Sequence, residues 1–158
     1  MGALPRAGRA AVIWLQLGSV SLGDAGASAL AAALDRGALP QLKHLFLRNA
    51  TIGDAGLVAL APALRRRPAL KQLYLGENPF GDEGLAALVA PPPAGAPPQQ
   101  VYTLGLSDTQ ITDDGCAYLA SRLRSGALPA LQFLHLYRTL ASRAARDAVY
   151  KARPGLDG

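Results

Sequence analysis

Four aspartates, spaced about 30 residues apart, are the residues of this chain best suited to chemistry: Asp24, Asp54, Asp82 and Asp113. Carboxylates can act as general acids or bases, or they can bind metal ions. A regular row of one carboxylate per repeating unit spaces them roughly 5 Å apart, along a backbone that itself needs acceptors. We therefore predict that each aspartate caps the start of a helix by accepting hydrogen bonds from its first free amides.

The two histidines and the single cysteine do not indicate a second chemical site. His44 and His135 are far apart in the sequence and have no matching carboxylate pair at ligand spacing, which predicts no metal and no cofactor. Cys116 follows a glycine within an apolar pattern, so we predict that it is a core residue of a protein in a reducing compartment. No Ser-His-acid set, phosphate loop or Cys-His pair stands out. The prediction is a protein without catalytic activity and without a small-molecule substrate.

Each aspartate belongs to a longer pattern of a branched aliphatic, two variable residues, Leu, one variable residue and Leu, followed by Asp-x-Gly. The first copy starts at Val12, and further copies start at Leu42, Leu70, Val101 and Leu131. The starts are 28 to 31 residues apart, and the fifth copy lacks the Asp and the Gly. A period of this length is typical of a solenoid, in which stacked repeats share one core.

This pattern resembles the leucine-rich repeat family, and within it the long repeats of ribonuclease-inhibitor type. The resemblance implies an α/β fold: a leucine-rich-repeat solenoid in the form of a right-handed horseshoe arc, with a parallel sheet on the concave side and helices on the convex side. We expect one leucine-rich repeat domain over residues 1–158, with repeats starting near 12, 42, 70, 101 and 131. The resemblance also implies protein binding, without naming the partner.

The spacing of the leucines places the elements within each repeat. The two leucines of Leu-x-Leu point to one face of a strand, so we predict that they face the core. Helices are expected near the four aspartates and Ser142, and the glycine two residues after each aspartate predicts a close approach of helix to strand. The family often places an asparagine three residues beyond the second leucine, and here Asn78 matches. The corresponding residues of the other copies are Val20, Ala50, Thr109 and Thr139.

Prolines interrupt the third predicted helix. Residues 90–100 contain five prolines, which end the helix and favour an extended loop. Such a segment is a possible ligand for a proline-reading domain. No two of these prolines are three residues apart, so the common Pro-x-x-Pro spacing is absent and a passive loop is the favoured interpretation.

The net charge of +5 raises an alternative function, a basic scaffold for nucleic acid or anionic surfaces. Its residues are Arg65, Arg66, Arg67, Arg122, Arg124, Arg143 and Arg146. The three arginines at 65–67 end a predicted helix, where cations suit the negative end of the helix dipole, so a solvated helix end is favoured and nucleic-acid binding is not. No run of 18 apolar residues and no signal peptide is recognisable, which favours a soluble, cytoplasmic protein that does not bind membranes.

The strand positions between the leucines form columns on the face opposite the core. The first column is Trp14, His44, Gln72, Thr103 and Phe133; the second is Gln16, Phe46, Tyr74, Gly105 and His135; the third is Gly18, Arg48, Gly76, Ser107 and Tyr137. Ser19, Asn49, Glu77, Asp108 and Arg138 follow at the rim. Aromatic and arginine side chains are common anchors of protein interfaces. The predicted partner-binding residues are Trp14, His44, Phe46, Arg48, Gln72, Tyr74, Glu77, Asp108, Phe133, His135, Tyr137 and Arg138.

The ends of the chain leave a third hypothesis open, a structural fragment of a longer repeat array. Gly-Ala-Leu-Pro occurs at 2–5 as well as at 37–40 and 126–129, where it joins a helix to the next strand. In that case Trp14 would cover the open first strand instead of binding a partner. At the other end, the Arg-rich residues 143–153 predict a polar closing helix.

Overall fold

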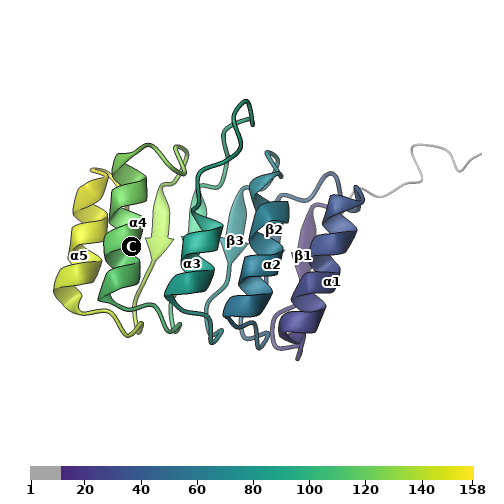
Figure 1. The fold of residues 1–158 in the computed structure, drawn as a ribbon, viewed down its shortest axis with the longest axis horizontal. Helices are drawn as coiled ribbons and strands as arrows, with labels where there is room; N and C mark the ends of the chain where they lie inside the picture. Colours follow the sequence, from purple (N-terminus) through teal and green to yellow (C-terminus); the bar gives the residue numbers. More distant parts are fainter. Residues whose placement is uncertain (1–11) are drawn as a thin grey trace, which may run out of the picture.

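The computed structural model describes residues 12–158, in which strands and helices alternate strictly (Figure 1). The strands are β1 (Trp14–Gln16), β2 (His44–Phe46), β3 (Gln72–Tyr74), β4 (Thr103–Gly105) and β5 (Phe133–His135). The helices are α1 (Gly23–Asp35), α2 (Asp54–Arg65), α3 (Asp82–Leu88), α4 (Asp113–Arg124) and α5 (Arg143–Ala152). The predicted strand and helix of each copy are confirmed. The first Gly-Ala-Leu-Pro copy, at 2–5, lies outside the described residues.

The strands form one parallel sheet in the order β1-β2-β3-β4-β5, and the helices pack on one face of it (Figure 1). The first strand leucines pair in register across the sheet, with Leu45 opposite Leu73 and Leu104 opposite Leu134. These four side chains are at most 2 % exposed. Each buried leucine contributes about 1.5–3 kcal/mol, so the leucine layer between sheet and helices is the main stabilising feature of the array.

The first repeat is covered less completely than the others. Leu15 and Leu17 are only partly buried, and Val12, Ile13 and Val20 are exposed by 38 to 52 %. The prediction of an inward, buried leucine pair is therefore confirmed for repeats two to five and only in part for repeat one. An end repeat has a neighbour on one side, which explains the difference among the described residues.

The four aspartates do not cap their own helices, so that prediction was wrong. Each accepts hydrogen bonds from the backbone where the helix of the next repeat begins. Asp54 Oδ1 lies 2.8 Å from both Gly81 N and Gly84 N, at the start of α3. Asp24, Asp82 and Asp113 bind Gly53, Thr112 and Ser142 in the same way. The aspartates are therefore ties between repeats.

Three of the four glycines two residues after the aspartates, Gly56, Gly84 and Gly115, lie against the previous repeat rather than against a strand, which corrects the second prediction. A Cβ atom on Gly56 would lie 2.4 Å from Asp24 Oδ1, and one on Gly115 would lie 2.1 Å from Asp82 Oδ1. Both distances are shorter than a van der Waals contact. Glycine at these positions lets one carboxylate reach the first turn of the next helix.

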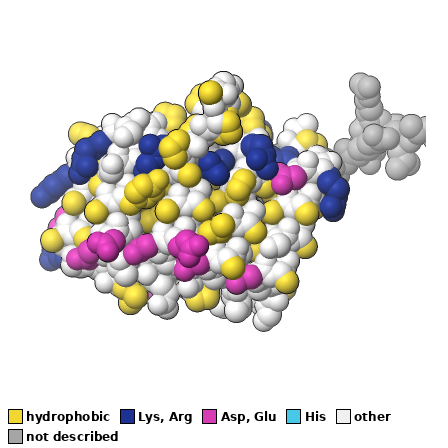
Figure 2. Space-filling view, in the orientation of Figure 1, with side chains coloured by type: hydrophobic (Ala, Val, Ile, Leu, Met, Phe, Trp, Pro, Cys, Tyr) yellow, Lys and Arg dark blue, Asp and Glu magenta, His cyan; other side chains and the backbone are white. Residues whose placement is uncertain are grey.

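Acidic and basic residues form separate bands on the helical face (Figure 2). The acids stand in the first turns of α2, α3 and α4, and several arginines stand in or after the last turns. This arrangement places each charge at the helix end whose partial charge is opposite. The basic band therefore has a structural explanation that does not require an anionic ligand.

Several of these arginines bind carbonyl groups of the preceding repeat, so the predicted solvated helix end is only partly correct. Arg67 donates to three carbonyl oxygens at the end of α1, and Arg153 donates to three at the end of α4. Burial lowers the pKa of Arg153. Arg66, in contrast, is exposed and pairs with Asp35 at 2.6 Å.

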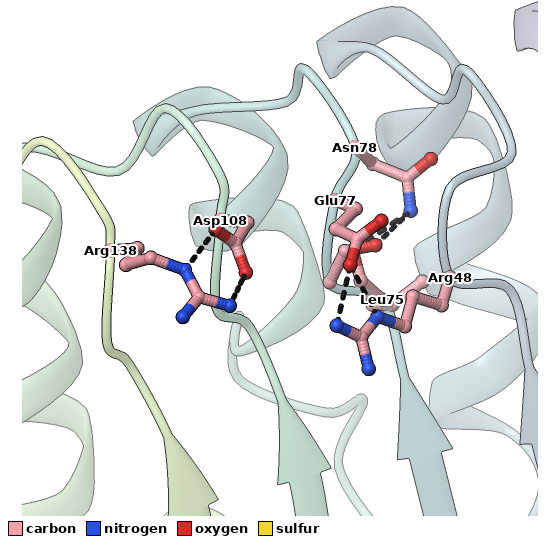
Figure 3. A network of polar contacts seen from close by, with 7 residues as sticks. Arg48, Leu75, Glu77, Asn78, Asp108 and Arg138 are labelled. Carbon is pink, nitrogen blue, oxygen red and sulfur yellow. Dashed lines mark hydrogen bonds and ion pairs between the residues drawn. The ribbon is translucent and has the colours of Figure 1, made fainter.

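Asn78 ties the third repeat to the second, as the family resemblance implies. Its Oδ1 accepts from Ala50 N and Ile52 N, both at 3.0 Å, and its Nδ2 donates to Leu47 O at 2.8 Å. The Nδ2 group also donates to Leu75 O at 2.8 Å (Figure 3). Asn78 is 2 % exposed. At the corresponding positions, the hydroxyls of Thr109 and Thr139 donate to a carbonyl three residues earlier. A threonine thus replaces one of the bonds that an asparagine makes.

The proline-rich segment leaves a gap in the helical layer. Helix α3 has 7 residues where α2 and α4 have 12. Arg65 donates to Pro91 O and Arg122 donates to Val89 O, which holds the start of the loop to the neighbouring helices. An apolar groove of about 310 Å³ remains between the loop and the end of α4.

Two other predictions concern the core and the C-terminal repeat. Cys116 is fully buried in the core, as predicted, and burial raises the pKa of its thiol to about 11. Residues 143–152 form the predicted last helix, in which Ser142 Oγ accepts from Ala145 N. Asp157 also pairs with β5, with Asp157 N donating to Gln132 O and Leu134 N donating to Asp157 O.

Candidate functional site: the outer face of the sheet

The predicted columns are real rows across the sheet. Trp14, His44, Gln72, Thr103 and Phe133 are consecutive partners in the strand register. Phe46, Tyr74, Gly105 and His135 are consecutive partners in the second row. Since side chains alternate along a strand, both rows project from the face opposite the buried leucines. The fold therefore brings the residues predicted from the sequence onto one surface.

Aromatic rings cover this surface over the first three strands. The ring of Trp14 lies 4.9 Å from His44 and 5.5 Å from Phe46, measured between centroids. Phe46 and Tyr74 are stacked at 5.1 Å with an angle of 6° between their planes. Trp14 is 65 % exposed. Trp14 contributes to this aromatic cluster and leaves most of its own surface to solvent.

The fourth strand departs from the prediction. Thr103, Gly105 and Ser107 were expected to be exposed, and all three are buried. Their side chains are short or absent, and the ring of Tyr74 leans over Gly105: a Cβ atom on Gly105 would lie 2.9 Å from Tyr74 Cδ1. The larger side chain of Tyr74 therefore shields Gly105 from the β3 side.

The short side chains leave a hollow, which we call the β4 notch. Its floor and walls are formed by Gly76, Gly105, Ser107, Tyr74, His135 and Tyr137. Arg48 and Asp108 complete its lining. The notch has a volume of about 130 Å³. Ser107 Oγ is buried and has no hydrogen-bond partner among the described residues.

Two ion pairs lie beside the notch at the rim, where the strands end (Figure 3). Arg48 Nε donates to Glu77 Oε1 at 2.8 Å, and Arg138 binds both carboxylate oxygens of Asp108 at 2.6 and 2.9 Å. The bond from Arg138 holds the pKa of Asp108 below its ordinary value. All four side chains are at least partly exposed, so each pair contributes little to stability.

The rim residues share an unusual backbone conformation. Ser19, Asn49, Glu77, Asp108 and Arg138 have φ angles between 54 and 61°. The left-handed region is uncommon for residues other than glycine, and here it recurs at the same position of each repeat. The turn is thus part of the repeat geometry, and it places the charged side chains in one row.

The remaining predicted residues have mixed roles. Gln72 Nε2 donates to Tyr102 Oη at 2.9 Å, so Gln72 is tied to the next repeat. Phe133 is 40 % exposed and Tyr137 is 47 % exposed, with Arg138 over the ring of Tyr137 at 4.9 Å. Within residues 12–158, His, Cys, Asp and Glu side chains form no group of three that could hold a metal ion.

Sequence reasoning missed the β4 notch. Its signal was present in the columns, since Gly76, Gly105 and Ser107 are small residues in neighbouring repeats, next to the large side chains of Tyr74, His135 and Tyr137. The pattern shows where side chains are short. Only the arrangement of the flanking rings shows that the space above them is open enough to form a hollow.

Comparison with known families agrees with this architecture. Residues 39–61, 68–89 and 103–120 match the model of the Leucine Rich repeat. The chain is a leucine-rich repeat protein of the ribonuclease-inhibitor-like type, and its strand–helix repeats extend the pattern to the segments before and after those matches. A comparison with curated proteins gives no match.

The class limits what the outer face of the sheet can do. Leucine-rich repeats are generally scaffolds for protein interaction and are not, as a rule, catalysts. Aromatic rings, paired charges and a small hollow provide contacts for another molecule. Separately, each helix of the described part of the chain is too short or too polar to cross a lipid bilayer.

Proposed function

We propose that this chain binds a protein partner on the concave face of its sheet, which is the face opposite the helices. The observation that carries the proposal is the aromatic cluster of Trp14, Phe46 and Tyr74, which is partly exposed although the leucine core does not need it. Exposed aromatic residues that are held rigidly lose little conformational entropy on binding, and they dominate the energetics of many interfaces.

The charged rim extends the contact surface beyond the rings. Two acidic residues stand between two arginines along this rim, in the order Arg48, Glu77, Asp108 and Arg138. A partner would be oriented by this pattern of positive, negative, negative and positive groups. The proposed mechanism is equilibrium binding by mixed apolar and charged contacts.

The basic band on the helical face supports a nucleic-acid scaffold less well. Arg65, Arg67 and Arg122 donate to backbone carbonyl oxygens, and Arg66 pairs with Asp35. These contacts occupy much of the donor capacity that phosphate groups would need. The band and the concave face lie on opposite sides of the molecule, so their roles can be tested separately.

A pull-down with matched variants tests the proposal. Wild type, the double variant Phe46→Ala/Tyr74→Ala and the helical-face variant Tyr118→Ala are immobilised and exposed to a nuclease-treated extract of the source cells. Tyr118 is 38 % exposed on α4, and it controls for the loss of an exposed aromatic side chain. Two anchors at about 1–2 kcal/mol each predict a loss of roughly 30- to 1,000-fold in affinity for the double variant.

Proteins retained by wild type and by Tyr118→Ala, and lost from the double variant, are the expected result. Thermal unfolding of the three proteins shows whether the double variant is still folded. An identical set of retained proteins in all three samples contradicts the proposed site. A parallel run with untreated extract and an Arg66→Glu variant covers the alternative: binding that disappears both after nuclease treatment and in Arg66→Glu points to the basic scaffold.

A further inference from the structure

We infer that the β4 notch is a receptor for one neutral aromatic side chain of the partner, and that it prefers a phenol to a plain phenyl ring. This inference rests on the proposed function, because it assigns one subsite of the concave face. It also makes a claim about the notch itself, which can be tested without the natural partner.

The size of the notch selects a single side chain. Its volume of about 130 Å³ is well below the 300–1,000 Å³ of a typical small-molecule pocket. Short side chains on β4 leave the space open, and the glycines at 76 and 105 contribute only backbone to its lining. A residue on an extended segment of a partner, laid along the sheet, would fit one side chain into it.

The row that contains Gly105 favours an aromatic occupant. Phe46, Tyr74, Gly105 and His135 are successive register partners, and the first two are stacked at 5.1 Å. Neighbouring strands in a sheet are about 4.7–4.9 Å apart, which is close to the preferred spacing of offset rings. The aromatic row stops at Gly105 and resumes at His135. A ring placed in the notch would lie between Tyr74 on one side and His135 on the other.

The electrostatics favour a neutral occupant. At the mouth of the notch, Arg48 is bonded to Glu77 and Asp108 is bonded to Arg138, so both pairs are closed. A charged side chain entering the notch would lose its water without gaining an unpaired countercharge. The neutral mouth is complementary to an uncharged ring.

Ser107 supplies the preference for a phenol. Its hydroxyl is buried, has no hydrogen-bond partner among residues 12–158, and belongs to a residue that lines the notch. A buried hydroxyl without a partner is costly and is uncommon in native proteins. Serine can turn between three staggered rotamers, which allows the hydroxyl to meet the oxygen of an entering phenol. The bond would satisfy both hydroxyl groups.

The test uses blocked amino acids as probes and amide NMR shifts as the readout. N-acetyl-tyrosine amide is titrated into the protein, next to N-acetyl-phenylalanine amide, N-acetyl-cyclohexylalanine amide and N-acetyl-arginine amide. We expect the tyrosine probe to give saturable shifts at the amides of Gly76, Gly105 and Ser107. The phenylalanine probe is expected to bind about 3- to 10-fold more weakly, and the other two more weakly still.

Variants separate the parts of the inference. His135→Ala removes one wall and should weaken the tyrosine probe about 3- to 10-fold, while Phe133→Ala, on the same strand but outside the notch, should not. Ser107→Ala should remove the difference between tyrosine and phenylalanine. Because Ser107 Oγ has no partner in the protein, this variant should be at least as stable as wild type.

Three results would overturn the inference. They are the absence of saturable shifts at the notch, equal binding of the cyclohexylalanine and tyrosine probes, and equal effects of His135→Ala and Phe133→Ala. Equal binding of tyrosine and phenylalanine would overturn the phenol preference. None of these results bears on the pull-down, so a failed notch and a failed concave face can be told apart.

Discussion

Replacing Asn78 with alanine should destabilise this protein more than any other single loss of a polar side chain that we describe. The side chain is 2 % exposed and accepts from Ala50 N and Ile52 N, in residues that are fully buried. Alanine leaves both amides without an acceptor. Each unsatisfied buried group costs about 1–3 kcal/mol, so we expect a loss of about 3–5 kcal/mol in the free energy of unfolding.

Urea unfolding followed by circular dichroism measures this loss, and thermal unfolding should show a decrease of roughly 6–20 °C in Tm. Thr109→Ala is the matched control, because Thr109 occupies the corresponding position of the next repeat and makes one side-chain bond, to Leu106 O. It should cost about 1 kcal/mol. The reasoning is refuted if Asn78→Ala costs no more than Thr109→Ala, since the bonds between repeats would then carry no extra stability.

Three further predictions concern the core, the helix ends and the thiol. Leu73→Ala should cost about 2–5 kcal/mol in urea unfolding, and a value under 1 kcal/mol would contradict the packed leucine layer. Arg67→Gln should lower the free energy of unfolding by about 1–3 kcal/mol, because it leaves three carbonyl groups without their donor. The control Arg66→Gln, at the exposed neighbouring residue, should change it by no more than about 0.5 kcal/mol. Equal effects of the two substitutions would contradict the structural role of Arg67. Burial raises the pKa of Cys116 from 9.0 to about 11, so the thiol stays protonated in the folded state up to a higher pH than in the unfolded state. The stability that this shift contributes is complete below pH 9 and is lost as the pH rises towards 11. Stability measured across this range should fall less steeply in Cys116→Ala, and parallel curves would argue against the shift.

The hydrophobic period was sufficient to predict the order of the elements and the starts of the helices. The signal is local, because the residues that define one face of a strand or a helix are only two to four positions apart in the sequence. The prolines likewise showed that the third helix would end early, since they act on their own backbone.

Contacts between repeats were not predictable in the same way. Asp54 is the first residue of its own helix, yet it binds the start of the next helix, because the coil of the array brings Gly84 N within 2.8 Å of its Oδ1. A spacing of about 30 residues between aspartates does not show whether the carboxylate lies closer to the start of its own helix or to the start of the next one. In the same way, Ser107 lines one hollow together with Tyr74 and His135, which come from other repeats.

The predicted site was a list of surface positions, and the sheet register places those positions on one face. The sequence could not show which of these positions are covered by neighbouring side chains and which border a hollow. Side-chain length alone does not distinguish a shielded glycine from an open one, and only the lean of the Tyr74 ring shows that Gly105 is covered on one side and borders a hollow on the other.

The ties between repeats can form only in a fixed order during synthesis, because some reach forward along the chain and others reach back. Asp54 reaches forward to the start of α3, whereas Arg67 reaches back to the end of α1. During synthesis, a newly emerged repeat therefore meets a carboxylate that is already in place, and it brings the guanidinium that finishes its predecessor. A nascent chain would thus carry a completed penultimate repeat and a growing repeat whose helix is still open at its carboxyl end.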